Sequence, residues 1–535
     1  DLAPAGYESI TVSLGLSMLV LPFILWAGPA GYFADRFSKR NVIVWCKVAE
    51  VLLMIVGVFA ILSGSIVAMF SVLFLMGSQS ALFGPAKYSA IPEIVRPTRI
   101  SAANGLVAMT TIVGIVSGTI VASYLYVWTE PLGKERWWLT MAVLVGVAGV
   151  GLLTSLLIHR LPIANPTRRV PWNPAGEAVH DLRVLWSNRP LLLAALGSAL
   201  FWGLAGLFQV NVDKYATEGL GLTPTGVAIL LAVLACGVAA GNIAAGWISG
   251  SRIELGLVPF AAGGIIFAAI LLAVLPIGVV PAGGVALGSS AYLMSAACLF
   301  LLGIGAGMYD VPLQSFLQYR SPVASRGTIM AASNLLTFSG MLLASGIFAV
   351  LGSFLSGRMI FLVSAIALAP AVVVMMRIIP RETMRFLIWC LSRLLYRVKI
   401  EGLENVPAHG GALLTPNHIS WADGLLVGLT SPRHPRFLVY AQYFEYPLIN
   451  WFGRLGGVIR VWPGKKSSVV QALRTARETL RRGDIVVIFP EGGLSRTGDL
   501  RPFESGFLSV QKGTGCPIVP VYLSGLWGSI FSFEG

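Results

Sequence analysis

The chain has 535 residues, of which 56% are hydrophobic and 12% are charged, and its formal net charge is +14. Soluble globular proteins contain about 25% charged residues, so this composition excludes an ordinary soluble protein and places most of the chain in lipid. The five cysteines are scattered without the spacing of a metal site or a disulfide framework. We therefore interpret them as small apolar packing residues and expect no bound metal.

Eleven apolar stretches are long enough to cross a bilayer, which requires about 20 residues. They cover residues 9–33, 41–62, 66–86, 101–127, 137–159, 192–213, 224–249, 256–277, 288–309, 328–351 and 359–379. Lysine and arginine gather in the loops after the first, third and fifth stretches, and the positive-inside rule places these loops in the cytoplasm. Eleven spans that begin outside end inside, so we expect the C-terminal segment to be cytoplasmic.

The first basic loop reads G-Y-F-A-D-R-F-S-K-R. It resembles the G-x-x-x-D-R-x-x-R-R signature between the second and third helices of the major facilitator superfamily of transporters. The resemblance implies a cytoplasmic gate made of Gly31, Asp35, Arg36 and Arg40. In this gate glycine allows close helix approach, and the carboxylate pairs with arginines or with a neighbouring helix end when the cytoplasmic side is closed. An ordinary positive-inside loop is the alternative. Because the family's loop follows helix two, we expect the first span to be helix two and helix one to be missing.

A polar segment, residues 160–191, separates five spans from six and resembles the central cytoplasmic linker of such transporters. The fold that the resemblance implies is two halves that rock about a central cavity. Ionisable residues at membrane depth are costly and functional by default, which makes Lys87, Asp213 and Asp310 candidates for that cavity. An ion pair near the membrane interface is the alternative for each of them.

After the last span, the segment 381–397 places four arginines around large apolar residues. This composition predicts an amphipathic helix at the membrane surface, and the alternative is a linker helix packed on the following domain. Beyond it, short β-rich segments alternate with helical patterns, which predicts an α/β sheet domain. Its excess of basic residues fits an anionic membrane face or an acidic carrier, and a membrane-tethered position argues against nucleic acid as a partner.

The stretch from Leu413 to Leu425 reads L-L-T-P-N-H-I-S-W-A-D-G-L and contains His418 and Asp423. An imidazole can remove the proton from an alcohol as it attacks a thioester, provided that a carboxylate holds the correct tautomer and stabilises the imidazolium. We therefore predict that His418 is a general base that Asp423 orients. A chance spacing in a loop is the alternative.

Two further segments follow, I-V-V-I-F-P-E-G-G-L-S-R-T-G (Ile485–Gly498) and P-I-V-P-V-Y-L (Pro517–Leu523). The three blocks in this order resemble the glycerolipid acyltransferase family, whose first block is H-x4-D and whose third is F-P-E-G. The resemblance covers about residues 398–535 and implies that Glu491 and Gly492 help to hold the glycerol-phosphate part of an acceptor.

Two arginines mark departures from this family. The second block, G-x-I-x-x-x-R, is matched by Gly457-Val458-Ile459, but Arg460 follows immediately instead of three places later. The usual E-G-T-R-S has become E-G-G-L-S-R, which displaces the arginine to Arg496. We keep both arginines as candidates for substrate binding and expect an unusual acceptor pocket.

A chain that joins both patterns resembles the bacterial lysophospholipid transporters fused to acyltransferases of the 2-acylglycerophosphoethanolamine type. The resemblance implies a multi-pass protein of the bacterial inner membrane that flips lysophospholipid from the outer to the inner leaflet and reacylates it. It also implies an acyl thioester of acyl-carrier protein or CoA as co-substrate, no bound cofactor, and an acyl-carrier-protein synthetase domain downstream. Two alternatives stay open: a 1-acylglycerol-3-phosphate acyltransferase that the bundle anchors, and a drug-type exporter with a degenerate tail.

The expected architecture is a polytopic all-α transporter of the major facilitator type with eleven spans, followed by a cytoplasmic α/β acyltransferase domain. The expected divisions are 1–159 for the N-terminal half (helices 2–6), 160–191 for the linker, 192–380 for the C-terminal half (helices 7–12), 381–397 for the connecting helix and 398–535 for the acyltransferase domain, which we expect to be cut short. The expected partners are lysophospholipid, membrane lipids and acyl-carrier protein, without nucleic acid.

Overall fold

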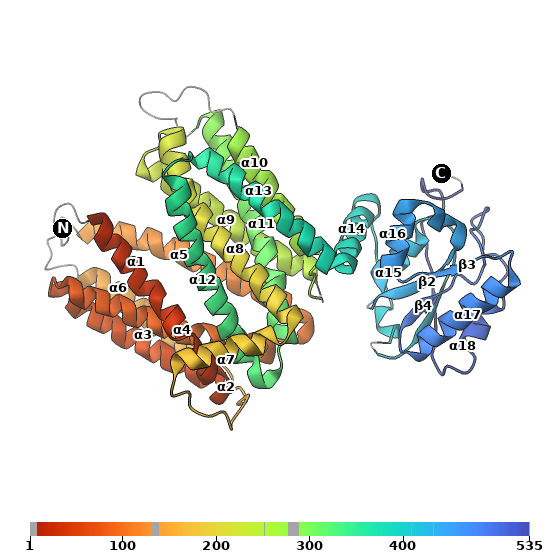
Figure 1. Ribbon diagram of the computed structural model, residues 1–535, viewed down its shortest axis with the longest axis horizontal. Helices are drawn as coiled ribbons and strands as arrows, with labels where there is room; N and C mark the ends of the chain where they lie inside the picture. The colour runs from red at the N-terminus through yellow and green to blue at the C-terminus, as the bar shows by residue number, and fades with distance from the viewer. Residues whose placement is uncertain are drawn as a thin grey trace. The chain divides into compact units, whose positions relative to one another are not determined.

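The computed structural model describes residues 8–129, 138–250, 252–275, 288–407, 409–431 and 433–533. The chain divides into two compact units, residues 1–377 and 378–535, which Figure 1 colours along the sequence. This division lies close to the predicted boundary at residue 380.

The first unit is a bundle of long apolar helices. Within the described ranges, nine helices are long and apolar enough to cross a membrane, and each lies at a predicted span. They are α3 (Lys39–Leu62), α4 (Ile66–Ile94), α5 (Ile100–Thr129), α8 (Arg189–Lys214), α9 (Pro224–Ser249), α10 (Leu257–Val274), α11 (Ser290–Arg320), α12 (Arg326–Gly352) and α13 (Gly357–Ile378). At the fifth predicted span lies a shorter helix, α6 (Trp138–Leu156), whose described apolar part is Ala142–Leu156.

The first predicted span, residues 9–33, is not one straight helix. It is a pair, α1 (Glu8–Leu25) and α2 (Ala27–Arg36), bent by 57° at the break. Proline has no N–H, so Pro29 cannot donate to the carbonyl of Leu25 and the helical ladder is interrupted there. The bent pair counts as a tenth span if the two helices cross the membrane together.

Helices α9 and α11 pack backbone to backbone because glycines line their interface. A Cβ atom on Gly241 would lie 2.2 Å from the carbonyl oxygen of Ile304, and one on Gly307 would lie 2.4 Å from that of Val238. Small residues allow membrane helices to approach in this way. We therefore assign these glycines to packing within the C-terminal half.

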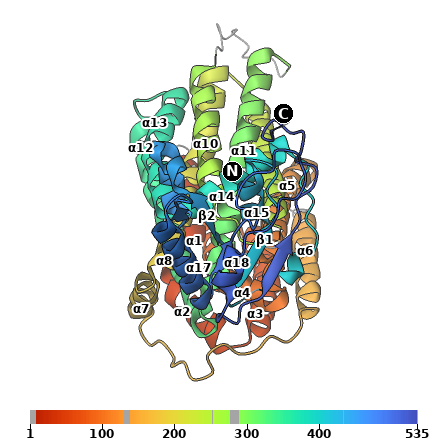
Figure 2. The same cartoon turned by 90° about the vertical axis from the view of Figure 1, so that its right-hand side faces the viewer.

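The predicted linker contains helix α7 (Pro174–Trp186), which lies beside α2 at one end of the bundle in both views (Figures 1 and 2). The Asn173 side chain starts this helix, because its Oδ1 accepts a hydrogen bond from the Gly176 N–H at 3.0 Å. Helices α2, α7 and α12 all pack on one another here. This end of the bundle positions one of the two sites described below.

The second unit begins with α14 (Pro380–Leu395), which confirms a helix at the predicted connecting segment; its position on a membrane stays a prediction. A five-stranded sheet of order β3-β2-β4-β1-β5 follows, and every neighbouring pair is parallel. The strands are β1 (Ala412–Pro416), β2 (Pro435–Tyr440), β3 (Ile459–Val461), β4 (Ile485–Val487) and β5 (Ile518–Val521). The prediction of an α/β sheet domain is confirmed.

Helices cover both faces of this sheet (Figure 1). They are α15 (Asp423–Thr430), α16 (Pro447–Leu455), α17 (Lys466–Arg481) and α18 (Gly506–Gln511). Successive residues of a strand point to opposite faces, so Leu413 packs with Ala476 of α17 while Leu414 packs with Val427 of α15. Burial on both faces explains why the central strand β4, Ile485–Val487, is apolar throughout.

Candidate functional site

The catalytic candidates lie at the carboxyl edge of the parallel sheet, where the sites of open α/β sheets form. Strand β1 ends at Pro416, just before His418, and Phe489 and Glu491 follow β4. Because β1 and β4 are parallel neighbours, their ends bring the segment with His418 and Asp423 next to the F-P-E-G segment with Glu491. The ring of Phe489 stacks on the imidazole of His418, with the two centroids 4.0 Å apart.

His418 and Asp423 form the predicted pair. Nδ1 of His418 lies 2.9 Å from Oδ2 of Asp423. The same oxygen accepts backbone hydrogen bonds from Ile419 at 2.7 Å and Ser420 at 2.9 Å. Asp423 is fully buried, whereas the His418 side chain remains 21% exposed. With the Nδ1 proton directed to the carboxylate, Nε2 is left to take a proton from a substrate.

We call residues 417–423, between β1 and the start of α15, the catalytic loop after the candidate base that they include. Its backbone is held on both sides. The N–H of His418 donates to Oε1 of Glu491 at 2.8 Å, and its carbonyl accepts from the N–H of Ser495 at 2.8 Å. The adjacent Asn417 bonds the backbone of Leu523, accepting from its N–H at 2.7 Å and donating to its carbonyl at 3.0 Å. The segments Ile485–Gly498 and Pro517–Leu523 therefore bond the backbone and side chain of the adjacent pair Asn417 and His418.

Glu491 lies in the interior of this arrangement and is 2% exposed. Its second oxygen, Oε2, accepts from the N–H of Arg501 at 2.9 Å, so both carboxylate oxygens already bond backbone N–H groups. The structure thus gives Glu491 a part in positioning His418, and its predicted contact with an acceptor stays a prediction. The next residue, Gly492, has φ +65°, a conformation that other residues adopt only with strain.

The two candidate arginines lie in different places. Arg460 is on β3, which β2 and β4 separate from β1; its guanidinium lies 4.6 Å from the ring centroid of Phe444 and donates to Asn450 at 2.9 Å. Arg496 follows the third block and lies 5.7 Å from the ring centroid of Phe533. Their roles in substrate binding stay predictions.

Among the residues that the structure describes, no group of three or more His, Cys, Asp or Glu side chains could hold a metal ion.

A cavity of about 310 Å³ opens on the flank of the catalytic loop. Its lining comes from three segments, namely Asn417 and Ile419, residues 498–500, and residues 522–525. The first and last of these are the segments that the Asn417–Leu523 bonds hold together. The two chain neighbours of His418 therefore line the cavity, whereas His418 itself does not.

The second candidate site closes the end of the bundle where α2, α7 and α12 meet. Asp35 of α2 is fully buried. Its Oδ1 accepts from the N–H of Gly327 at 2.7 Å, and its Oδ2 accepts from the N–H and hydroxyl of Thr328 at 2.9 and 2.8 Å. These donors belong to the first turn of α12, whose N-terminus attracts negative charge. Asp35 therefore ties the N-terminal half to the C-terminal half.

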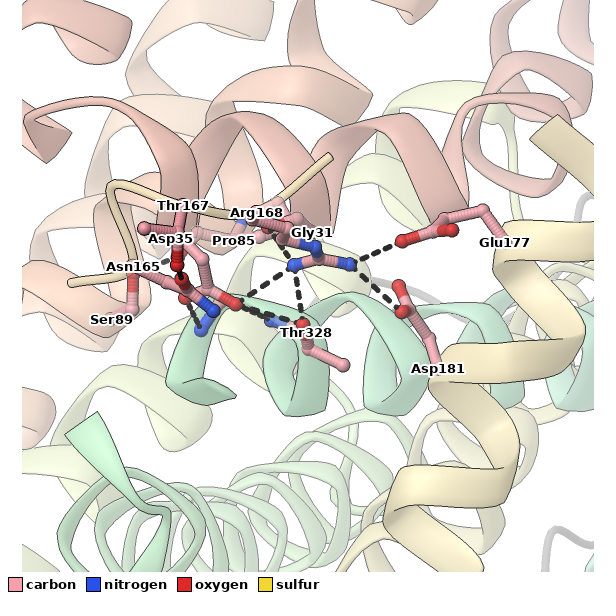
Figure 3. Close-up of polar contacts among 11 residues, drawn as sticks. Gly31, Asp35, Pro85, Ser89, Asn165, Thr167, Arg168, Glu177, Asp181 and Thr328 are labelled. Carbon is pink, nitrogen blue, oxygen red and sulfur yellow. Dashed lines mark hydrogen bonds and ion pairs between the residues drawn. The ribbon is translucent and has the colours of Figure 1, made fainter. Parts of the chain in front are cut away.

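Arg168, from the predicted linker, is the cation at the centre of this site (Figure 3). Its Nη1 donates to the carbonyl of Gly31 at 3.0 Å, to Oδ2 of Asp35 at 3.0 Å and to the hydroxyl of Thr328 at 2.6 Å. One guanidinium nitrogen thus contacts both α2 and α12. The linker therefore takes part in joining the two halves.

The other terminal nitrogen of Arg168 bonds the linker helix α7. Nη2 donates to Oε1 of Glu177 at 2.6 Å and to Oδ1 of Asp181 at 3.1 Å (Figure 3). Burial raises the pKa of Asp181 to about 8, because desolvation of the carboxylate outweighs the attraction of the guanidinium. A Cβ atom on Gly31 would lie 2.7 Å from Oδ2 of Asp181, so only glycine lets α2 come this close to α7.

A second ionic contact joins the halves near the same end. Lys39 at the start of α3 is fully buried, and its Nζ lies 2.7 Å from Oε1 of Glu93 on α4. Arg326, at the start of α12, lies 3.7 Å from the same carboxylate oxygen. Glu93 is therefore shared between a lysine of its own half and an arginine of the other half.

Comparison of the sequence with models of known protein families agrees with the two-unit architecture. Residues 5–345 match the family model described as Major Facilitator Superfamily, which is more than half of the chain. The chain belongs to the Major Facilitator Superfamily. Residues 397–524 match the family model described as Acyltransferase, so the chain joins a major facilitator unit to a C-terminal acyltransferase domain.

Curated relatives of the major facilitator unit carry the name lysophospholipid transporter LplT. The protein from Pectobacterium carotovorum is 28% identical over 341 residues, covering 62% of this chain and 75% of the relative. The protein from Klebsiella pneumoniae is 28% identical over 349 residues, covering 62% of this chain and 78% of the relative. Neither similarity extends over the whole of this chain.

Solved structures share the fold of the major facilitator unit. FucP in its outward conformation superposes with a TM-score of 0.54 at 13% identity, covering 70% of this chain and 90% of FucP. A bacterial homologue of the iron transporter ferroportin in its outward-facing state gives 0.52 at 16% identity, covering 70% and 91%. Similarities at this identity concern the fold alone.

The two predicted gate arginines of the major facilitator unit contact groups other than Asp35. Arg40 donates to the carbonyls of Ile158 at 2.6 Å and Leu156 at 3.1 Å, at the end of α6, which satisfies carbonyls that a helix end leaves unpaired. Arg36 lies 5.9 Å from the ring centroid of Phe37. Asp35 pairs with an arginine, Arg168, and with the N-terminal turn of α12, which are the two kinds of partner that the resemblance implies. The roles of Arg36 and Arg40 in a gate stay predictions.

The three cavity candidates have different surroundings. Asp310 on α11 is buried and accepts a hydrogen bond from the hydroxyl of Ser198 on α8 at 3.0 Å. Lys87 is partly buried and donates to the hydroxyl of Thr111 at 3.3 Å. Asp213 is exposed near the end of α8. Their roles in transport stay predictions.

Sequence reasoning missed the anionic half of the Arg168 cluster and the contact at Glu93. Glu177 and Asp181 are four residues apart, which places both on one face of α7, and Arg168 precedes them in the same linker. Two acidic residues on one face of a helix, with an arginine nearby in the chain, were the sequence signal that could have predicted the ion pairs of Arg168. Nothing in the sequence pairs Glu93 with Arg326, because the contact depends on how α4 meets α12.

Proposed function

We propose that the chain carries lysophospholipid across the inner membrane, from the outer to the inner leaflet, and acylates it to diacyl phospholipid. The observation that carries the proposal is the presence of an oriented His418–Asp423 pair in the same chain as a major facilitator unit. The names of the curated relatives support lysophospholipid as the cargo. The acyltransferase family match supports acylation as the second step.

In the proposed reaction His418 acts as the general base. Its Nε2 removes the proton from the free glycerol hydroxyl while the hydroxyl oxygen attacks the carbonyl carbon of an acyl thioester. The tetrahedral intermediate then collapses, the carbon–sulfur bond breaks, and the leaving thiolate takes the proton from the imidazolium. Asp423 stabilises that imidazolium through Nδ1. The cavity beside Asn417 supplies room for part of a substrate next to the catalytic loop.

The co-substrate in this proposal is the acyl thioester of acyl-carrier protein or CoA, without a bound cofactor. The acyltransferase domain then works on the cytoplasmic side, where such thioesters are made. In the same proposal, an acyl-carrier-protein synthetase downstream would recharge the carrier.

Two other functions make different demands on the structure. An acyltransferase that uses the bundle only as an anchor would not need a buried cluster linking α2, α7 and α12. A drug exporter with a degenerate tail would not need a positioned His418. The cluster around Arg168 favours transport over anchoring, and the bonds around His418 favour catalysis over degeneracy.

The test uses the full chain in proteoliposomes, with labelled lysophospholipid added outside and the acyl thioester trapped in the lumen. Only chains whose acyltransferase domain faces the lumen then contribute. We expect labelled diacyl phospholipid to form in a protein-dependent manner. Acylation of lysophosphatidic acid in the lumen, with no labelled lysophospholipid crossing the bilayer, would overturn the proposal in favour of the anchored enzyme.

A further inference from the structure

A chain of aromatic side chains follows the carboxyl edge of the acyltransferase sheet. Trp421, in the catalytic loop, lies edge to face with Tyr443, with centroids 5.6 Å apart. Tyr443 contacts Tyr440 at 5.7 Å, and Tyr440 contacts Trp462 at 5.8 Å. The four rings form a continuous row, which we call the aromatic rim.

The sheet topology explains why the rim lies beside the active site. Tyr440 is the last residue of β2, and Trp462 directly follows β3. Because all strands are parallel, their carboxyl ends meet at the edge where His418 follows β1. The row therefore runs along the active-site edge from the β1 loop to the end of β3.

The rim is a surface and not a part of the core. Trp421 is 53% exposed, and Tyr440 and Trp462 are each 37% exposed. Two more large side chains near it along the chain are exposed as well, Leu425 after Trp421 and Tyr446 after Tyr443. Large amphipathic rings usually bury their apolar bodies. A contiguous exposed row of them indicates an interaction site.

Basic residues border the rim at its β3 end. Nζ of Lys465 lies 5.7 Å from the ring centroid of Trp462, and Lys466 follows at the start of α17. Residues 459–466 contain Arg460 together with these two lysines and contain no acidic residue. The one acidic side chain in the Tyr440–Tyr446 segment is Glu445. The rim therefore combines exposed aromatic rings with positive charge.

We infer that the aromatic rim binds the surface of an anionic lipid bilayer, with Trp421 and Trp462 at the headgroup level and Lys465 and Lys466 against anionic headgroups. Tryptophan and tyrosine concentrate at membrane–water interfaces because their rings are apolar and their N–H or O–H groups reach water. Basic residues beside them are attracted to anionic lipids. Such a contact turns the edge of the sheet that carries His418 toward lipid, whichever lysophospholipid is the acceptor.

Amide hydrogen exchange on the full chain in nanodiscs tests this inference without relying on activity. One set of discs contains phosphatidylcholine alone, and the other contains phosphatidylcholine with phosphatidylglycerol. We expect residues 440–446 and 459–466 to exchange several-fold more slowly in the anionic discs. Residues 506–513, which include α18 and contain none of the rim residues, are expected to exchange equally in both.

Two variants separate lipid binding from damage to the fold. Trp462→Ser should abolish the lipid-dependent protection, whereas Val470→Ser, which alters an exposed apolar side chain of α17 outside the rim, should leave it intact. Unchanged protection of β1 and β4 confirms that the Trp462→Ser domain is folded. Trp462→Ser should also raise KM for lysophospholipid in bilayers several-fold without raising KM in detergent.

Two results would overturn the inference. One is equal exchange of residues 440–446 and 459–466 in neutral and anionic discs. The other is protection that depends on added acyl-CoA or acyl-carrier protein and not on lipid charge, because the rim would then be a donor-binding surface. Neither result bears on His418 as the base, so the failure of this inference is distinguishable from a failure of the proposed function.

Discussion

The catalytic loop and the closed end of the helix bundle both hold a buried carboxylate, but they are assembled from very different distances along the chain. Asp423 lies five residues from His418 and accepts from two backbone N–H groups of its own loop. Asp35 accepts from the N–H of Thr328, 293 residues away, and pairs with Arg168, 133 residues away. The first site belongs to one loop, whereas the second exists only when the two halves and the linker meet.

This difference predicts that substitutions at the two sites change different free energies, namely the barrier to acyl transfer at the first site and the balance between transporter conformations at the second. The His418–Asp423 geometry is preorganised and should persist in every conformation of the transporter. The Arg168 cluster stabilises one conformation, because its bonds must break when α2 and α12 move apart. Changes at the first site should therefore alter chemistry, and changes at the second should alter a conformational equilibrium.

The largest expected effect is at His418. His418→Ala should lower the rate of acyl transfer by about 10²–10⁴-fold, because it removes the general base, and should leave lysophospholipid uptake unchanged. The rate is measured in detergent with saturating acyl thioester. An acylation rate near that of the wild type would remove His418 from the mechanism.

Arg168→Gln should have the next largest effect. It leaves the buried carboxylate of Asp35 without its cation, and breaking such a buried pair typically costs about 3–5 kcal/mol. The closed state, in which α2 and α12 are joined through this cluster, should lose population. Spin labels at Ile94 and Val323, one on each half, would report this loss as a longer distance between the labels. Arg169, the exposed neighbour of Arg168 in the chain, supplies the matched control. Arg169→Gln should leave the distance between the labels unchanged. Unchanged distances in Arg168→Gln would mean that the cluster does not hold the halves together.

Glu491→Gln should have a smaller effect on turnover. An amide cannot accept from both the His418 and Arg501 N–H groups, and an unsatisfied buried donor costs about 1–3 kcal/mol. If Glu491 positions His418, kcat falls while KM for the acceptor stays constant. If KM for the acceptor rises instead, Glu491 contacts the acceptor as the family resemblance implies. Steady-state kinetics over a range of acceptor concentrations separates the two outcomes.

The smallest expected effect is a pH dependence of the closed state through Asp181. Its pKa in the cluster is about 8 against an ordinary value of 3.8, so the closed state favours the neutral carboxyl. That contribution is fully present below the ordinary pKa and is lost as pH rises to about 8. The charged groups facing Asp181 are Arg168, Glu177 and Asp35.

Asp181→Asn tests this dependence. The distance between spin labels at positions 94 and 323 should lengthen with rising pH in the parent protein and change less in Asp181→Asn. An identical pH response in the two proteins would assign the titration to another group.

Local patterns made much of the molecule predictable from the sequence. Runs of apolar residues predicted the nine helices of the described ranges that are long and apolar enough to cross a membrane, and short β-rich segments between helical patterns predicted the α/β sheet. His418 and Asp423 were predictable because their spacing within one loop is itself the signal. The bend between α1 and α2 was also within reach, since Pro29 removes the hydrogen bond that a straight helix needs.

The remaining features depend on tertiary packing that no local pattern encodes. The sequence places Arg36 and Arg40 next to Asp35, but α6 carbonyls take Arg40, and the linker delivers Arg168 instead. The burial of Glu491 depends on how the ends of β1 and β4 meet. The aromatic rim likewise draws its rings from the ends of three strands and the segments that follow them, which only the parallel sheet brings to one edge.

The central claim is that one chain performs two separable steps on the same lipid. The most direct measurement follows uptake and acylation together in proteoliposomes for the wild type, His418→Ala and Arg168→Gln. We predict that His418→Ala delivers lysophospholipid that stays unacylated, and that Arg168→Gln slows delivery while acylating detergent-dispersed lysophospholipid at the wild-type rate. Loss of both activities in each variant, with the folds intact, would contradict the account.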